Sequence, residues 1–243
     1  MTPYYEHAGI TIYHADCREI LPSIECDAVI TDPPYGQTNL SWDRVVPGWA
    51  AQIRARTAWV FGSFKSLCVI TTTEFSGWSI AQEIVWEKHN GTNLHNDRFR
   101  RVHELAVQLY LGAWETIWTN PQFTHDATAR TVRKKARPAQ WLGRTGATVF
   151  RSEDGGPRLM RSVIRARSCH GSALHPTQKP TAILVPLIRY SVPDDGVVVD
   201  PFAGSGSTLV AAKNEGRRAI GIEIEERYCE IAAKRLAQEV MAL

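Results

Sequence analysis

The chain of 243 residues has no apolar run long enough to cross a membrane. Its opening residues, 1–7, have neither the basic start nor the apolar middle of a signal peptide. We therefore expect a cytoplasmic protein with no membrane partner.

Cysteine is also scarce and unpaired. The five cysteines are scattered along the chain and form no Cys-x-x-Cys pair, so the sequence favours reduced thiols over a disulfide framework or a zinc site. Cys169 and His170, with His175 nearby, could be metal ligands, but no second cluster accompanies them. We expect no metal.

Charge is distributed unevenly. Residues 124–168 contain eleven Lys or Arg and three acidic residues, a net charge of +8. Because the overall charge is +3, the rest of the chain carries −5. The same segment contains four glycines and little periodicity, which predicts a loop-rich insertion. Such a segment suits a polyanion, although a solvated basic surface is the alternative. The candidate DNA-binding residues are Arg133, Lys134, Lys135, Arg137 and Arg144.

The stretch Thr-Asp-Pro-Pro-Tyr-Gly, residues 31–36, directly follows an apolar run. Two successive prolines fix two backbone torsions and remove two amide donors, so the chain must leave the strand as a stiff loop. Pro33 also holds Asp32 in an extended conformation, which fixes the directions of nearby hydrogen-bond acceptors. An ordinary turn that ends a strand is the alternative interpretation.

A β-branched run at residues 196–200 leads through a Gly-x-Gly turn into an apparent helix at 209–213, and a second strand at 219–222 ends at Glu223. Helix amides behind such a turn favour the negative end of a ligand. Glu223 follows Gly204 by nineteen residues, close to the spacing at which nucleotide-binding sheets place an acidic residue on a ribose. A βαβ unit with a purely structural turn is the alternative.

Three motifs together resemble a known family. Residues 32–35, Asp-Pro-Pro-Tyr, are similar to the catalytic motif of amino methyltransferases, and residues 200–208 are similar to their cofactor motif D-P-F-x-G-S-G-T-T. Residues 175–180, His-Pro-Thr-Gln-Lys-Pro, match a segment of the beta group of DNA adenine-N6 and cytosine-N4 methyltransferases. The catalytic motif precedes the cofactor motif, which is the circularly permuted order of that group.

The resemblance implies an α/β fold, a doubly wound, mostly parallel seven-stranded Rossmann-like sheet. Further strands are expected at residues 57–61, 84–86 and 105–111, and the first strand, 10–14, is expected beside the strand that ends at Glu223. The expected domains are residues 1–112 for the catalytic half, 113–172 for a target-recognition insertion and 173–243 for the cofactor half.

The resemblance also implies a site. The expected cofactor is S-adenosyl-L-methionine, released as S-adenosyl-L-homocysteine, and the expected catalytic residues are Asp32, Pro33, Pro34 and Tyr35. The expected cofactor-binding residues are Asp16, Cys17, Asp32, Thr177, Gln178, Lys179, Asp200, Phe202, Gly204, Ser205, Gly206, Ser207, Thr208 and Glu223. A catalytic role for His103 or Glu104 is a weaker hypothesis.

The favoured function is methylation of adenine N6 at specific sites in double-stranded DNA. Adenine is favoured because the motif begins with Asp32, whereas cytosine-N4 members of the family more often begin it with Ser. Methylation of cytosine N4 is the alternative. An RNA or protein amine methyltransferase, and a nucleic-acid-binding protein without activity, are less favoured. The family resemblance also suggests a homodimer, a cognate restriction endonuclease and association with the nucleoid of a prokaryotic or phage-infected cell.

Overall fold

The computed structural model describes residues 2–36, 39, 43–92, 97–134, 146–169, 175 and 178–238. The chain divides into a larger unit, Met1–Asn120 with Ser162–Leu243, and a smaller unit, Pro121–Arg161. The smaller unit lies inside the 113–172 segment expected as an insertion. No helix in the described part of the chain has the length and apolar character of a membrane span.

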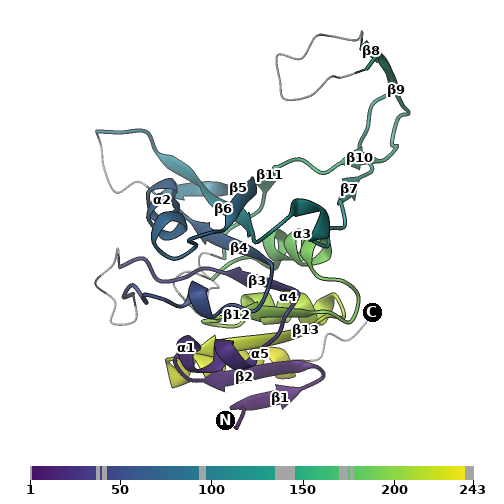
Figure 1. Cartoon of the computed structure of the whole chain (residues 1–243). Coiled ribbons are helices and arrows are strands. Elements are labelled where there is room, and N and C mark those ends of the chain that lie inside the picture. The colour runs from purple at the N-terminus through teal and green to yellow at the C-terminus, as the bar shows by residue number, and fades with distance from the viewer. Residues whose placement is uncertain are drawn as a thin grey trace. The chain divides into compact units, whose positions relative to one another are not determined.

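The larger unit contains one nine-stranded sheet with helices on both faces (Figure 1). Its strands are β1 Tyr5–His7, β2 Ile10–His14, β3 Ala28–Thr31, β4 Thr57–Gly62, β5 Ser79–Thr92, β6 Arg101–Tyr110, β11 Val163–Arg165, β12 Val197–Asp200 and β13 Arg218–Glu223. Its α-helices are α1 Cys17–Ile20, α2 Phe64–Thr73, α3 Thr181–Ser191, α4 Ser207–Asn214 and α5 Glu226–Ala237.

The strand order is β1-β2-β13-β12-β3-β4-β6-β5-β11. Five neighbouring pairs are parallel and three are antiparallel, namely β1 with β2, β4 with β6, and β6 with β5. This confirms the expected mostly parallel sheet, and β1 and β11 add one strand at each edge. The parallel pairing of β2 with β13 confirms that the two ends of the sequence meet in the sheet.

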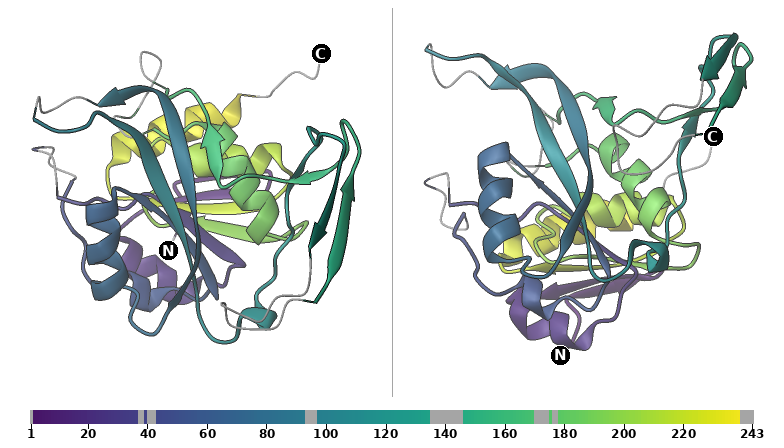
Figure 2. Two further views of the ribbon diagram at one scale, coloured as in Figure 1. Left: turned by 90° about the horizontal axis from the view of Figure 1, so that it is seen from above. Right: turned by 45° about the horizontal axis from the view of Figure 1, so that its top comes forward.

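Alternation along the central strands divides the core into two layers. In β3, Ala28 and Ile30 belong to the cluster that packs against α3, α4 and α5, whereas Val29 belongs to the cluster that packs against α1 and α2. Successive side chains of a strand point to opposite faces, so a strand that is apolar throughout must be covered on both sides. Figure 2 shows these two helical layers on either side of the sheet.

The strand predicted at residues 84–86 is much longer in the structure. β5 runs from Ser79 to Thr92 and pairs with β6 as an antiparallel ladder with two register shifts. Its ends carry polar and exposed residues, and even Ile80 is 61% exposed. An antiparallel ladder can face water on one side, so its length does not follow the apolar segment from which it was predicted.

The smaller unit is built from short antiparallel pairs. β7 (Phe123–Thr124) pairs with β10 (Arg158–Leu159), and β8 (Arg130–Lys134) pairs with β9 (Thr148–Ser152). Most of its described side chains are exposed. A two-stranded ladder buries little apolar surface, which explains why this segment shows no strong sequence periodicity.

Candidate active site

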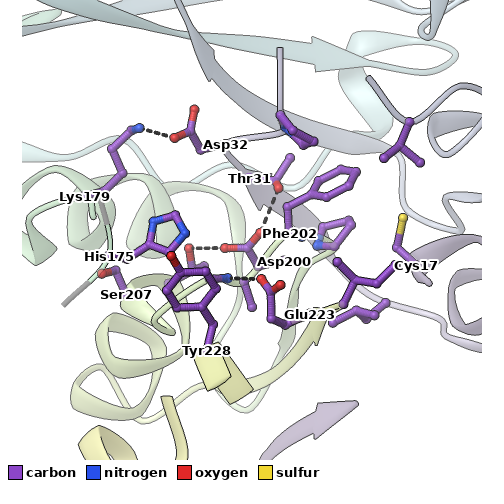
Figure 3. Close-up of a pocket in the computed structure, with 18 of the residues that line it drawn as sticks. Cys17, Thr31, Asp32, His175, Lys179, Asp200, Phe202, Ser207, Glu223 and Tyr228 are labelled. Carbon is purple, nitrogen blue, oxygen red and sulfur yellow. Dashed lines mark hydrogen bonds and ion pairs between the residues drawn. The ribbon is translucent and has the colours of Figure 1, made fainter. Parts of the chain in front are cut away.

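A pocket opens at the carboxyl ends of β2, β3, β12 and β13, where a doubly wound sheet places its ligands. Its volume is about 910 Å³ when the space open to solvent is counted. The pocket brings together eleven of the predicted site residues: Asp16, Cys17, Asp32, Pro34, Lys179, Asp200, Phe202, Gly204, Ser207, Thr208 and Glu223. Figure 3 shows the pocket and labels Cys17, Asp32, Lys179, Asp200, Phe202, Ser207 and Glu223 among them.

Asp32 follows β3 and its carboxylate is held from two sides. The Tyr35 hydroxyl donates to Asp32 Oδ1 at 2.7 Å, and Lys179 Nζ donates to Asp32 Oδ2. The backbone amides of Tyr35 and Gly36 both donate to Asp43 Oδ1 at 2.8 Å, which closes the loop behind the prolines. The orientation of Asp32 is therefore fixed before any ligand arrives.

Tyr35 points inward. Its hydroxyl also contacts the carbonyl of Phe61, and burial raises the pKa of the Tyr35 phenol well above its usual value. Tyr35 does not line the main pocket; it lines a neighbouring hollow together with Pro33 and Pro34. Pro34 lines both, so the two spaces meet at the catalytic loop.

Lys179 is buried in a row of alternating charges. Its ammonium contacts Asp32 and lies 3.6 Å from Glu104 Oε2, while Glu104 Oε1 accepts from Lys88 at 2.9 Å. Burial lowers the pKa of Lys179, but Asp32 and Glu104 outweigh it and the net pKa is raised. Burial likewise raises the pKa of Glu104, yet the two lysines lower it overall. Glu104 and Lys179 are therefore both charged at neutral pH.

The glycine turn follows β12 and is anchored by Asp200. Asp200 is buried and accepts from the hydroxyls of Thr31 and Thr208 at 2.7 Å each, and from the Phe202 amide at 3.1 Å. Burial raises the pKa of Asp200 to about 6 against these hydrogen bonds. Asp200 thus connects β3, β12 and the start of α4.

Glu223, at the end of β13, faces the same turn. Its Oε2 accepts from the Gly204 amide and its Oε1 from the Glu225 amide, both at 2.8 Å. Burial raises the pKa of Glu223, partly offset by these amides. Each oxygen retains a second lone pair, so the carboxylate can still accept from hydroxyls in the pocket.

Asp16 and Cys17 form the edge of the pocket at the end of β2. Asp16 caps α1, with Oδ1 accepting from the Arg18 amide at 2.9 Å. The Arg18 guanidinium lies 2.5 Å from the other carboxylate oxygen, and this contact lowers the pKa of Asp16. Burial raises the pKa of the Cys17 thiol to about 12, so that thiol is neutral.

The segment that precedes α3 covers the glycine turn. The His175 ring lies within about 3.5 Å of where a Cβ on Gly204 would sit, and Gln178 accepts from the Ser205 hydroxyl at 3.3 Å. Burial lowers the pKa of His175 to about 4, and Lys179 and Arg227 add to this. The neutral His175 ring also packs edge-on against Tyr228 at 4.2 Å.

Several predicted residues lie away from the pocket or outside the described residues. Gln178, Ser205 and Gly206 support the turn without lining the pocket. Thr177, Lys135, Arg137 and Arg144, and the side chain of Lys134, lie outside the described residues. Arg133 is exposed on β8 of the smaller unit.

His175 and Tyr228 line the pocket but were not among the predicted site residues. His175 begins the His-Pro-Thr-Gln-Lys-Pro segment, so the motif itself could have indicated it. Tyr228 is a buried residue of α5 and looks like an ordinary core position in the sequence. Among the described residues, no three His, Cys, Asp or Glu side chains converge as a metal site would require.

Sequence comparison now identifies the family. The profile of the N6/N4 DNA methylases, N6_N4_Mtase, described as "DNA methylase", matches residues 26–234. The chain belongs to this N6/N4 DNA methylase family. This confirms the family that the three sequence motifs indicated, and the chain is a DNA methyltransferase of the N6/N4 class.

Curated relatives of this DNA methylase are similar over nearly their whole length. Type II methyltransferase M.ScaI of Streptomyces caespitosus is 26% identical over 274 residues, covering 99% of this chain and 86% of the relative. Type II methyltransferase M2.LlaDCHI of Lactococcus lactis subsp. cremoris is 28% identical over 268 residues, covering 96% and 91%.

Solved structures share the fold of this DNA methylase. The M1.HpyAVI–SAM complex superposes with a TM-score of 0.62 at 27% identity, covering 94% of this chain and all of that chain. PvuII DNA methyltransferase, titled cytosine-N4-specific, has a TM-score of 0.65 at 15% identity, covering 99% and 90%, and shows the fold alone. The cofactor expected from the sequence is thus the one named in the M1.HpyAVI complex.

Proposed function

We propose that this DNA methyltransferase transfers a methyl group from S-adenosyl-L-methionine to the N6 amine of adenine at specific sites in double-stranded DNA. The proposal rests chiefly on Asp32, which lines the same pocket as the glycine turn and Glu223. An acceptor for an amine and the residues for a nucleoside cofactor thus share one pocket.

The chemistry needs an acceptor at the amine. The lone pair of an exocyclic amine is delocalised into the base, and hydrogen bonds from both of its hydrogens to fixed acceptors direct that lone pair outward. We assign these acceptors to the Asp32 carboxylate and the Pro33 carbonyl. Each Asp32 oxygen has one donor, Tyr35 or Lys179, and keeps a lone pair for the substrate.

The pocket fits the cofactor. Glu223 would accept from the ribose hydroxyls, the glycine turn permits close approach of the backbone, and Asp16 would accept from the adenine amine of the cofactor. When bound, the cofactor supplies an electrophilic sulfonium methyl group. A nitrogen–carbon bond forms as the sulfur–carbon bond breaks, and the amine proton then leaves to solvent or through Asp32.

The base must leave the duplex to reach this pocket, at a cost of a few kcal/mol. We propose that Tyr35 stacks on the flipped base through the hollow that it lines with Pro33 and Pro34. The basic segment around Arg133 would contact the phosphate backbone as a target-recognition unit, as would Lys134, Lys135, Arg137 and Arg144.

Adenine is favoured over cytosine because the catalytic motif begins with Asp32 rather than Ser. Cytosine N4 remains the second candidate, since both bases present a similar amine. An RNA or protein amine is less favoured, because the permuted motif order and the arginine-rich segment are typical of the DNA-modifying group. The Type II names of two relatives support a cognate restriction endonuclease as a partner. The homodimer stays a prediction.

Nucleoside analysis tests this proposal. Unmethylated duplex DNA is incubated with the protein and methyl-labelled S-adenosylmethionine, digested to nucleosides and analysed by mass spectrometry, with RNA in a parallel reaction. We expect N6-methyldeoxyadenosine. Labelled N4-methyldeoxycytidine would establish the alternative, and label in RNA alone would refute the assignment of DNA.

A further inference from the structure

A second cleft lies beside the catalytic loop, within the larger unit. It is bounded by Gly62 at the end of β4, the start of α2, and the start of β6, and it encloses about 990 Å³ including the space open to solvent. It lies outside the basic segment from which DNA contacts were predicted.

The cleft is electropositive. Lys65, Arg98 and Arg101 line it, against one carboxylate, Glu104. The charge of Glu104 is already compensated, because Lys88 lies 2.9 Å from one carboxylate oxygen and Lys179 lies 3.6 Å from the other. Glu104 therefore does not neutralise the cations that line the cleft.

Two of these cations are not engaged by ion pairs. Arg98 pairs with Asp97 at 2.8 Å, whereas no described carboxylate forms an ion pair with Lys65 or Arg101. Both side chains belong to exposed residues. Cations that protrude together into a cleft raise the local concentration of a polyanion.

Exposed aromatic rings accompany the cations. Phe64 lines the cleft and is 74% exposed, and Phe99, beside Arg98 in the chain, is fully exposed. A positively charged groove interleaved with aromatic rings is the arrangement that binds single-stranded nucleic acid, where the cations contact phosphates and the rings stack on bases.

The cleft leads to the reacting group. Its wall residue Glu104 contacts Lys179, which contacts Asp32. Lys65 also lines the hollow that contains Pro33 and Tyr35, so one lysine borders both spaces. A strand lying in the cleft would deliver its nucleotide next to the catalytic loop.

We propose that this cleft binds the phosphodiester backbone of the DNA strand that carries the target nucleotide, with Lys65 and Arg101 as the main phosphate contacts. The inference rests on the proposed function for its choice of DNA. It adds a backbone-binding site on the larger unit, so that DNA is held next to Asp32 as well as by the basic segment.

Salt-dependent binding tests the cleft. Lys65→Gln, Arg101→Gln and the double variant are compared with Lys234→Gln, an exposed lysine on α5 that is paired with Glu230. The affinity for a 20-base-pair duplex is measured across a salt series. We expect the slope of log K against log salt to fall by about 1 for each cation removed from the cleft, and to stay unchanged in Lys234→Gln.

Cofactor affinity and thermal stability serve as checks on the fold, and Lys65→Arg should restore the slope because it keeps the charge. An unchanged slope in the folded double variant would overturn the inference, even if the wild type methylates DNA. If the wild type binds DNA through these residues but transfers no methyl group, the proposed function is overturned while the inference that the cleft binds DNA holds. Loss of cofactor affinity together with the slope would also contradict the inference, since it would assign the residues a structural role.

Discussion

Asp32→Ala is the substitution that removes the proposed acceptor from the reacting amine. A preorganised acceptor of this kind is worth ~3 kcal/mol in the transition state, which corresponds to a loss of roughly 100-fold in the rate of methyl transfer. Cofactor affinity should change by only a few fold, because the glycine turn, Asp200 and Glu223 keep their hydrogen bonds.

The structure also predicts the cost to the fold. Removing one partner of a buried ion pair destabilises a protein by about 3–5 kcal/mol when the other charge is left alone. Lys179 would keep Glu104 at 3.6 Å, so Asp32→Ala should cost less than that range. Asp32→Asn keeps one oxygen acceptor and should retain more activity than the alanine variant.

The assay is single-turnover transfer of labelled methyl to duplex DNA, with excess enzyme, alongside calorimetric titration of the cofactor and a denaturant midpoint. A folded Asp32→Ala variant whose transfer rate stays within threefold of the wild type would refute the assigned role. An Asp32→Ala variant whose cofactor affinity falls as much as its transfer rate would contradict the prediction that Asp32 acts on the amine and contributes little to cofactor binding.

Three further predictions concern the cofactor half of the sheet. Glu223→Gln should weaken cofactor binding by about 10- to 100-fold, because hydrogen bonds to a charged acceptor contribute about 1.5–3 kcal/mol; an unchanged dissociation constant by calorimetry would contradict this role. Gly206→Ala should lower the melting temperature more than Gly216→Ala. Both glycines have positive φ (76° and 67°), but only a Cβ at residue 206 would lie 2.9 Å from Ala232. Equal decreases in melting temperature would contradict a destabilising role for that contact. The contribution of His175 to stability should be lost as the pH falls from about 6.5 to about 4, because in this range the unfolded chain binds a proton at His175 and the folded chain does not. Asp200, whose pKa burial raises to about 6, acts in the opposite direction, so the test is the difference between variant and wild type. In urea titrations, His175→Gln should lack on the order of 1–3 kcal/mol of the wild-type loss over this range; the same pH dependence in both proteins would refute the assignment.

The sequence predicted the central strands and the glycine turn well because their signals are local. Residues 28–31 form a mostly apolar run that Asp32 follows, residues 197–200 form one that ends at Asp200, and both are strands of the sheet in the structure. Parallel strands place their carboxyl ends at one edge of a sheet, and the pocket at that edge contains both Asp32 and Glu223.

Contacts between distant segments could not be predicted in the same way. Lys179 was expected among the cofactor-binding residues, and nothing in its neighbours in sequence indicates that its ammonium lies between Asp32 and Glu104. The inward orientation of Tyr35 likewise depends on a hydroxyl contact with Phe61, twenty-six residues away. The cleft beside Lys65 is assembled from three separate elements and has no sequence motif.

Sequencing with direct detection of modified bases tests whether the protein methylates adenine N6 at specific DNA sites and needs Asp32 to do so. Unmethylated genomic DNA is treated with the protein and S-adenosylmethionine, and the Asp32→Ala variant serves as the control. We predict N6-methyladenine at one recurring short sequence in the wild-type reaction and its near absence with the variant. Unmodified DNA after treatment with a folded, cofactor-binding wild type would contradict it.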